Sequence, residues 1–301
     1  MVSDKLDVLV FGDTAIDYFY EVEAFPKKNM ASEITKSRRF YGGMGANTAV
    51  VAKALGLSVG LVSVIGTDAE DYMKYLSNMG IELHLKGVFG DTTKSMFFKN
   101  NGDQVSFFYK GVTEKLDELE PGKTFEKELI KRTNVVYLGR TYLNLQKKVV
   151  KSCRGKFVVY NPGYGVYAFT SIPQAFKDVL SKTTVLIVNQ HELEHLQSLG
   201  FRIGSVHGPK TTIVTKGSKG CSVFGRNTEV DIGCFKTGVV DASGAGDAFN
   251  AGFIAGQVKG HDVYDSVRLG NAAASFIVEA WGCQTNLPSW EKALERYRGI
   301  V

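Results

Sequence analysis

Short runs of apolar residues, many of them β-branched, recur along the chain and alternate with helical patterns. The runs are apolar at successive positions, which indicates strands buried on both faces, as in a parallel sheet. Six of them begin at residues 7, 59, 134, 156, 184 and 210, and they read DVLVFG, VGLVSVIG, NVVYLG, KFVVYN, TVLIVN and KTTIVTKG. Between them lie helical patterns such as GANTAVVAKALG, AEDYMKYLSNMG and AFKDVLSK. This alternation predicts a three-layer α/β/α fold with a mainly parallel central sheet.

Two stretches break this rhythm. Residues 16–41 and 85–110 alternate apolar and polar residues, and the second contains an NNGD turn, which predicts β-hairpins that pair with each other. A small sheet built from them would stand over the carboxyl ends of the parallel strands, where ligands bind in such folds. We therefore expect one domain over residues 1–301, with a lid formed by about residues 16–41 and 85–110.

The composition narrows the class of protein. The 301 residues are 44% hydrophobic and 22% charged, and the net charge of +5 comes without a basic stripe or a nucleic-acid recognition motif. No segment reaches the roughly 18 to 20 apolar residues of a membrane helix, and the N-terminus is too acidic for a signal peptide. The four cysteines are scattered without a C-x-x-C pair, which is typical of a reducing compartment. We expect a cytoplasmic protein that binds neither nucleic acid nor membranes.

The segment VVDASGAGDAFNAGFIAG places glycines where an irregular turn becomes a helix. The backbone amides of Gly244, Ala245 and Gly246 can converge there on an anion at the positive end of the helix dipole. Asp247 falls in the first helical turn, where its carboxylate could accept a proton from a hydroxyl while the amides hold a phosphoryl group's charge. On spacing alone, a tight turn followed by an Asp that merely suits the dipole explains the pattern about equally well.

A second glycine cluster, YGGMGANTAVVAKALG, also opens a helix, but it matches neither a Walker P-loop nor a dinucleotide fingerprint. Gly42 and Gly43 offer flexible backbone beside Asn47, whose amide can donate to and accept from a polyhydroxy ligand. In isolation, a helix start packed closely on the sheet is slightly favoured. Nearer the N-terminus, FGDTAID places Asp17 just past the first strand, where a carboxylate can accept hydrogen bonds from two adjacent sugar hydroxyls.

The stretch NQHELEHLQSLG fits two incompatible sites. His191 and His195 match the zinc-protease pattern H-E-x-x-H, whereas Asn189 and Glu192 fit a nucleotide enzyme that holds magnesium and phosphate. A zinc protease needs both histidines one turn apart on a settled helix, but the strand before Asn189 leaves His191 in the first helical turn at best. We therefore expect exposed histidines and a magnesium role for Glu192.

These separate patterns share one explanation. GGMGANTAVVAKALG followed by VIGTDAEDYMKYLSNMGI resembles the first signature of the ribokinase (PfkB) family of carbohydrate and nucleoside kinases, and VVDASGAGDAFNAGF resembles its second, more specific one. Both occur in the family's order and at its usual separation, and the resemblance spans nearly the whole chain. It implies a ribokinase-like three-layer α/β/α sandwich with a small inserted β-sheet as lid. It also implies phosphorylation of an alcohol group with ATP and Mg²⁺.

Carried over position by position, the resemblance implies a role for each matching residue. The catalytic base is Asp247, and the anion hole for the transferred phosphoryl group is Gly244, Ala245 and Gly246. The hydroxyls of the acceptor are contacted by Asp17, Gly42, Gly43 and Asn47. The ATP and Mg²⁺ sites take Asn189 near the phosphates, Glu192 at Mg²⁺ through water, Thr215, Gly217 and Gly220 along the nucleotide, Asn271 beside the adenine and Gly282 in the last loop.

Two positions depart from the family pattern. Asp241-Ala242 stands where the second signature usually reads Asp-Thr or Asp-Cys, beside which many members bind a monovalent cation. A K⁺ site therefore stays a possible hypothesis that the sequence supports only weakly. Lys216 replaces the usual small or apolar residue after its strand, where it is either a phosphate contact or a solvated charge.

The acceptor is the part of the function that the residues constrain least. VSFFYKG brings Phe107, Phe108 and Tyr109 into the lid, and strand alternation puts Phe108 on one face and its neighbours on the other. Rings suit a purine or pyrimidine more than a plain sugar, and archaeal-type nucleoside kinases of this family look similar there, so we predict a nucleoside bound by Phe108 and Tyr109. A ribokinase-, fructokinase- or 2-keto-3-deoxygluconate-type sugar kinase stays as the alternative, because the rings could equally pack the lid or a dimer interface. A non-catalytic binding protein on the same fold is a remote third hypothesis.

Two further residues follow central strands. Arg140 in LGRTYLN and Asn161 in YNPGYG are expected to line the acceptor pocket, without an assigned role. Lid sheets of this family often pair between subunits, so a homodimer through the lid is a further hypothesis.

Overall fold

The structure is a computed structural model that describes residues 5–122, 125, 127–205 and 208–299. Its large sheet is built from nine strands: β1 (Leu6–Phe11), β4 (Val59–Gly66), β5 (Glu82–Val88), β8 (Thr133–Gly139), β9 (Phe157–Asn161), β10 (Val185–Asn189), β11 (Thr211–Thr215), β12 (Cys221–Phe224) and β13 (Glu229–Ile232). Their order across the sheet is β13-β12-β11-β10-β9-β8-β1-β4-β5. The strands from β11 to β5 run parallel, and β12 and β13 add an antiparallel edge.

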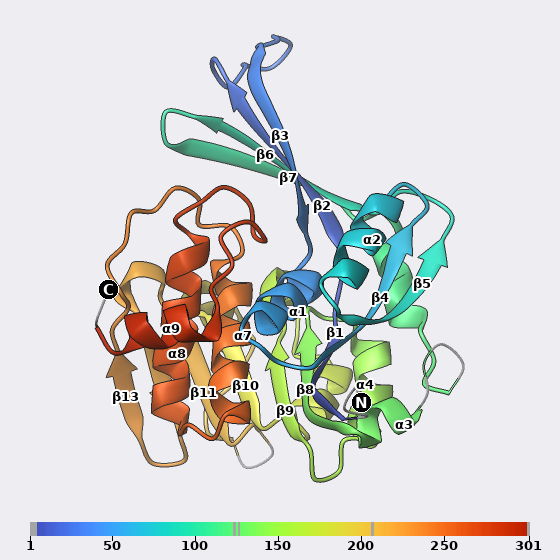
Figure 1. Ribbon diagram of the computed structural model, residues 1–301, viewed down its shortest axis with the longest axis vertical. Helices are drawn as coiled ribbons and strands as arrows, with labels where there is room; N and C mark the ends of the chain where they lie inside the picture. The colour runs from blue at the N-terminus through green and yellow to red at the C-terminus, as the bar shows by residue number, and fades with distance from the viewer. Residues whose placement is uncertain (1–4, 123–124, 126, 206–207, 300–301) are drawn as a thin grey trace.

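Helices cover both faces of this sheet (Figure 1). One face carries α1 (Met44–Ala54), α2 (Glu70–Asn78), α7 (Ala245–Val258), α8 (Val263–Ile277) and α9 (Trp290–Tyr297). The other carries α3 (Lys127–Lys131), α4 (Leu143–Lys151), α5 (Gln174–Leu180) and α6 (Gln190–Ser198). Short 3₁₀ helices lie at η1 (Gly111–Glu118), η2 (Gly163–Ala168) and η3 (Gly217–Lys219).

Strand β1 shows why the apolar runs are continuous. Val8 and Val10 pack into the core on the α1 and α7 face, while Leu9 and Phe11 pack into the core on the α4 and α5 face. A strand buried on both sides must be apolar at successive positions, because neither face meets water. The predicted three-layer α/β/α sandwich with a mainly parallel sheet is confirmed.

A second, smaller sheet is formed by two insertions, one after β1 and one after β5. It consists of β2 (Ala15–Val22), β3 (Ile34–Gly42), β6 (Thr93–Asn100) and β7 (Asp103–Tyr109), in the order β3-β2-β6-β7. Figure 1 shows it rising from the edge at which the parallel strands end. Its two pairs of strands join through β2 and β6, which run parallel to each other.

The second stretch of the expected lid begins too early. Residues 85–88 end β5 in the large sheet, and the small sheet starts again only at Thr93. Strand β5 lies at the edge of the large sheet and is only partly covered, so its sequence ELHLKGV alternates like a hairpin strand. Alternation alone could not assign it to the correct sheet.

Candidate active site

Three cavities meet at the N-terminus of α7. The small-sheet cavity has a volume of about 600 Å³, and its lining includes Asp13, Asp17, Gly43, Asn47, Phe97, Phe108, Arg140, Tyr164, Gly244, Asp247 and Cys283. The α8 cavity has about 560 Å³, and its lining includes Thr215, Gly217, Gly220, Ala245, Gly246, Phe249 and Asn271. A bridging cavity of about 310 Å³ shares residues with both, and its lining includes Arg140, Asn161, Asn189, Glu192, Thr215, Gly246 and Asp247.

The turn before α7 divides these spaces. Gly244 has a left-handed backbone with φ of 76°, and a Cβ there would lie 2.6 Å from the Cβ of Cys283, so no other residue fits without strain. The first amides of a helix have no partner within it, and they carry the positive end of its dipole. Because Ala245 and Gly246 line one cavity and Asp247 lines another, these amides lie at the boundary between two binding spaces.

Asp247 is held by the first turn of α1. Its Oδ2 accepts a hydrogen bond of 2.8 Å from Asn47, and the Asn47 carbonyl oxygen accepts one of 2.8 Å from Gln284. The pKa of Asp247 is raised to about 8, mainly by burial and also by the carboxylates of Asp13 and Asp17, while the hydrogen bond from Asn47 opposes the rise. A carboxyl group with such a pKa is a competent proton acceptor near neutral to mildly alkaline pH.

Asp17 lies on β2 in the same cavity and is 4% exposed. Burial raises its pKa to about 6, while hydrogen bonds from Ser95 and Cys283 lower it. Gly42 does not line the cavity; a Cβ there would approach the Asp17 carboxylate to 2.1 Å, so its small size makes room for Asp17. Asp17 and Asp247 therefore differ, because at neutral pH Asp17 is mainly ionised whereas Asp247 is mainly protonated and becomes a proton acceptor as the pH rises towards 8.

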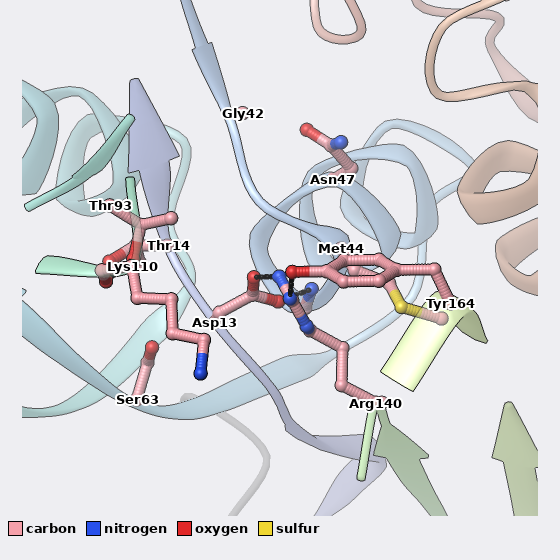
Figure 2. Close-up of polar contacts among 12 residues, drawn as sticks. Asp13, Thr14, Gly42, Met44, Asn47, Ser63, Thr93, Lys110, Arg140 and Tyr164 are labelled. Carbon is pink, nitrogen blue, oxygen red and sulfur yellow. Dashed lines mark hydrogen bonds and ion pairs between the residues drawn. The ribbon is translucent and has the colours of Figure 1, made fainter. Parts of the chain in front are cut away.

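An ion pair of Arg140 with Asp13 also lines the cavity, and only Arg140 was predicted from the sequence. Arg140 donates a hydrogen bond of 2.6 Å to Asp13, which is 1% exposed, and it donates another to the hydroxyl of Tyr164 (Figure 2). The Arg140 guanidinium carbon lies 4.4 Å from the centre of the Tyr164 ring, on which Phe108 stacks at 5.5 Å and 19°. The ion pair and the stack connect the segments that follow β1 and β8 to η2 and to β7, so they join the small sheet to the body.

Asp13 and Tyr164 were missed for different reasons. Asp13 stands four residues before Asp17 in FGDTAID, and its position directly after a buried strand was an available signal. Tyr164 follows β9 in YNPGYG, but nothing in the sequence shows that it meets Phe108, which is 56 positions away. Arg140 itself has a positive φ of 61°, which is uncommon for a residue with a side chain.

Besides Gly42, three assigned residues do not line any of these cavities. Tyr109 lies on the opposite face of β7 from Phe108, because successive side chains of a strand alternate. The Lys216 ammonium pairs with Asp231 at 3.0 Å. Gly282 donates its amide to Asp241 at 3.3 Å and packs against the ring of Phe40. These positions do not support the expected substrate contact of Tyr109. They do not support the expected nucleotide contacts of Lys216 and Gly282 either.

Four other residues assigned to the nucleotide share the α8 cavity: Thr215, Gly217, Gly220 and Asn271. Thr215 ends β11, and Gly217 and Gly220 flank η3. The Asn271 side chain donates to the carbonyl of Gly233 at 2.9 Å and accepts from the Cys221 thiol at 3.4 Å. Its amide therefore holds the wall of the cavity, which makes Asn271 a supporting residue in this structure.

Asn189 and Glu192 form a capping box at the start of α6. The Asn189 side chain accepts from the Glu192 amide at 2.8 Å, and the Glu192 carboxylate accepts from the Asn189 amide at 3.0 Å. Burial raises the pKa of Glu192. Mg²⁺ is usually held in proteins by one or two carboxylates together with phosphates and water, so a buried carboxylate beside the α7 amides fits this ion.

The zinc hypothesis finds no support. His191 is exposed and lies 3.5 Å from Glu194, while His195 is half-buried against the ring of Tyr167, contrary to the expectation that it is exposed. Within the described part of the chain, no group of three or more His, Cys, Asp or Glu side chains could hold a metal ion.

Comparison with known proteins identifies the family. The sequence model of the pfkB family carbohydrate kinases matches residues 5–290. The chain belongs to this family. The kinase is 36% identical to a nucleoside kinase of Methanocaldococcus jannaschii, over 95% of its own length and 94% of the relative. It is 30% identical to a nucleoside kinase of Methanothermobacter thermautotrophicus, over 98% and 97%.

Solved structures agree with the sequence relatives. The crystal structure of Methanocaldococcus jannaschii nucleoside kinase, described as an archaeal member of the ribokinase family, superposes with a TM-score of 0.88 and 35% identity, and the match covers 98% of this chain and 99% of that one. The ribokinase-like fold is thus confirmed. The kinase is a phosphotransferase with an alcohol group as acceptor, and ATP use follows from its kinase relatives. No helix in the described residues is long and apolar enough to cross a membrane.

Proposed function

We propose that this kinase transfers the γ-phosphoryl group of ATP to the hydroxymethyl group of a nucleoside, with Mg²⁺ as cofactor. The observation that carries the proposal is the stack of Phe108 on Tyr164 in the wall of the cavity that also contains Asp247. A sugar needs mainly hydrogen-bonding groups, whereas a nucleobase gains from an aromatic platform. The volume of about 600 Å³ falls in the range of pockets for ligands of this size. Both curated relatives named above are nucleoside kinases.

The chemistry follows from the placement of Asp247. Its carboxylate takes the proton of the attacking hydroxyl, while the amides of Gly244 to Gly246 receive the negative charge that develops on the transferred phosphoryl group. Asp17 and Asn47 supply acceptors and a donor for the remaining sugar hydroxyls in the same cavity. The small sheet acts as a lid that limits the access of water, which would otherwise compete as acceptor.

We assign ATP to the α8 cavity, with its phosphates towards the bridging cavity. Thr215, Gly217 and Gly220 would line the nucleotide, and Asn189 and Glu192 would hold Mg²⁺ through water. When bound, Mg²⁺ neutralises the charge of the phosphates. The only protein charge on the described lining of the α8 cavity is Lys236.

A panel of acceptors tests the proposal. ADP release with Mg-ATP would be measured for inosine, adenosine, guanosine, cytidine, ribose, fructose and 2-keto-3-deoxygluconate. We expect turnover of one or more nucleosides and none of free ribose. Turnover of a free sugar alone would keep the kinase chemistry and overturn the nucleoside assignment. No turnover of any acceptor would favour a binding protein on this fold.

We also propose that the kinase forms a homodimer through the small sheet and that it is located in the cytoplasm. Strands β3 and β7 are the outer strands of the small sheet, and Val105 and Phe107 are exposed on β7, which supports pairing between two copies. The four cysteines are free, as in a reducing compartment. Sedimentation equilibrium checks the dimer; a monomer at micromolar concentration would contradict it.

A further inference from the structure

A lysine of the small sheet reaches a carboxylate directly before the α7 turn. Lys99 lies near the end of β6, and its ammonium is 3.2 Å from Oδ1 of Asp241, 142 positions later in the chain. The Asp241 side chain is 2% exposed and that of Lys99 is 21% exposed. A buried carboxylate needs a partner for its charge, so this ion pair is part of the structure and not a surface contact.

Asp241 organises the backbone around the anion hole. Its Oδ1 accepts from the amide of Ser243 at 3.2 Å and from the Ser243 hydroxyl at 2.9 Å, directly before Gly244. Its Oδ2 accepts from the amide of Gly282 at 3.3 Å, and the next residue, Cys283, packs against Gly244. The carboxylate therefore ties together the two loops that position the first amides of α7.

The surroundings of Lys99 are built for a cation. Its ammonium lies 4.2 Å from the centre of the Trp281 ring and 5.2 Å from that of Phe19. Aromatic faces attract a positive charge, and more strongly where water is excluded. Phe19 stacks on Phe97 of β6 and meets Trp281 edge to face, so the rings form one wall across the small sheet and the C-terminal loop.

This arrangement does not fit a free K⁺ ion at Asp241. Oδ1 already accepts from the Lys99 ammonium and from Ser243, and Oδ2 accepts from Gly282. Ala242, which departs from the family signature, offers no side-chain oxygen as a ligand. The Lys99 ammonium already supplies a positive charge at this carboxylate.

We propose that Lys99 is a positioning residue that supplies, from within the chain, the positive charge at Asp241 that keeps the anion-hole turn in place. The inference rests on the proposed kinase mechanism. It makes the activity independent of added monovalent cations, and it links the position of the small sheet to the turn at Gly244. Lys99 itself touches neither the acceptor nor the reacting phosphoryl group.

Lys99→Met tests this inference, because Met keeps the length and apolar stem of the side chain and removes the charge. Turnover of the best acceptor would be measured in chloride salts of choline, Na⁺, K⁺ and NH₄⁺ at equal ionic strength. We expect wild-type turnover to vary less than about twofold, and kcat of the variant in choline to fall about tenfold or more, since misplaced amides lower the rate. K⁺ or NH₄⁺ should restore at least part of it. The control is Lys94→Met, which lies on the same strand but is paired with the exposed Asp91. Its turnover should be the same in all four salts.

Three results would overturn the inference: K⁺-dependent wild-type activity, a Lys99→Met variant as active as wild type in choline, or an equal loss in every salt, which a purely structural role would give. Thermal unfolding tests the inference about Lys99 independently of the proposed function. In the variant alone, K⁺ should raise Tm above the value in choline, and this holds even if no acceptor in the panel is turned over. Equal Tm values of the variant in K⁺ and in choline would count against the inference.

Discussion

The two sides of the α7 turn are built from different chemistry. The small-sheet cavity is rich in charge, with Asp13, Asp17, Arg140 and Asp247 all lining it, whereas the α8 cavity is lined mainly by glycine, small side chains and apolar groups. Buried charges must pair, so the first cavity depends on partners brought from many elements. The second needs mostly backbone, which short glycine-rich segments provide locally. Substitutions should therefore have larger effects on the small-sheet side.

The largest expected loss of activity comes from removing the proposed base. Asp247→Asn keeps the shape of the side chain and its contact with Asn47 but removes the proton acceptor, so kcat should fall by on the order of 10² to 10⁴. The Kd for ATP, measured by calorimetry, should stay within about threefold, because the α8 cavity is intact. Asp178→Asn, on the exposed face of α5, serves as control. Retention of most of kcat would refute the assignment.

The ion pairs of the two sides offer a direct contrast. Arg140→Met leaves Asp13 buried without its cation, and such a loss typically costs about 3 to 5 kcal/mol of unfolding free energy. Lys216→Met breaks a pair whose Asp231 side chain is 75% exposed, so we expect little measurable change. Urea denaturation monitored by circular dichroism would compare the variants. Equal losses of stability would show that the cavity charges are not as buried as the contacts imply.

The lid rings distinguish binding from packing. Phe108→Ala removes one ring of the stack, and since stacking of a base is worth about 1 to 3 kcal/mol, KM for a nucleoside should rise about 5- to 150-fold while kcat changes less. Tyr109→Ala, next to it on the opposite face, is the matched control, with an expected change below about twofold. A KM unaffected by Phe108→Ala would assign the rings to packing and favour a sugar acceptor.

The response to pH tests the environment of the base. Because burial raises the pKa of Asp247 to about 8, the base is protonated below that pH and becomes ionised above it. kcat/KM should therefore rise with pH, about tenfold per unit below pH 8, and level off above it. Asp17, with a pKa of about 6, adds a second ionisation at lower pH. A profile that is flat from pH 6 to 9 would contradict the environment described for Asp247.

Features that are local in the chain were predictable. The continuous apolar runs predicted the parallel sheet, since burial on both faces requires them. The turn before Asp247 indicated the start of a helix, where the first amides have no partner within the helix. The segments that line the α8 cavity, around Thr215 and Gly246, are of this kind. Each carries its signal within a few residues.

Contacts between distant segments were decided only by the tertiary structure. Asp13 meets Arg140, Phe108 meets Tyr164, and Lys99 meets Asp241 across separations of 127, 56 and 142 residues. Strand β5 and the small sheet alternate in the same way, and only pairing assigned each strand to its sheet.

The physical reason is the range over which each signal acts. Periodicity, turns and helix ends depend on neighbours in the chain, so the sequence alone determined the layered fold and the α7 turn with Asp247 directly after it. Charge pairs and ring stacks depend on which surfaces the packed elements bring within a few ångströms. Those contacts shaped the small-sheet cavity and placed the ammonium of Lys99 at Asp241.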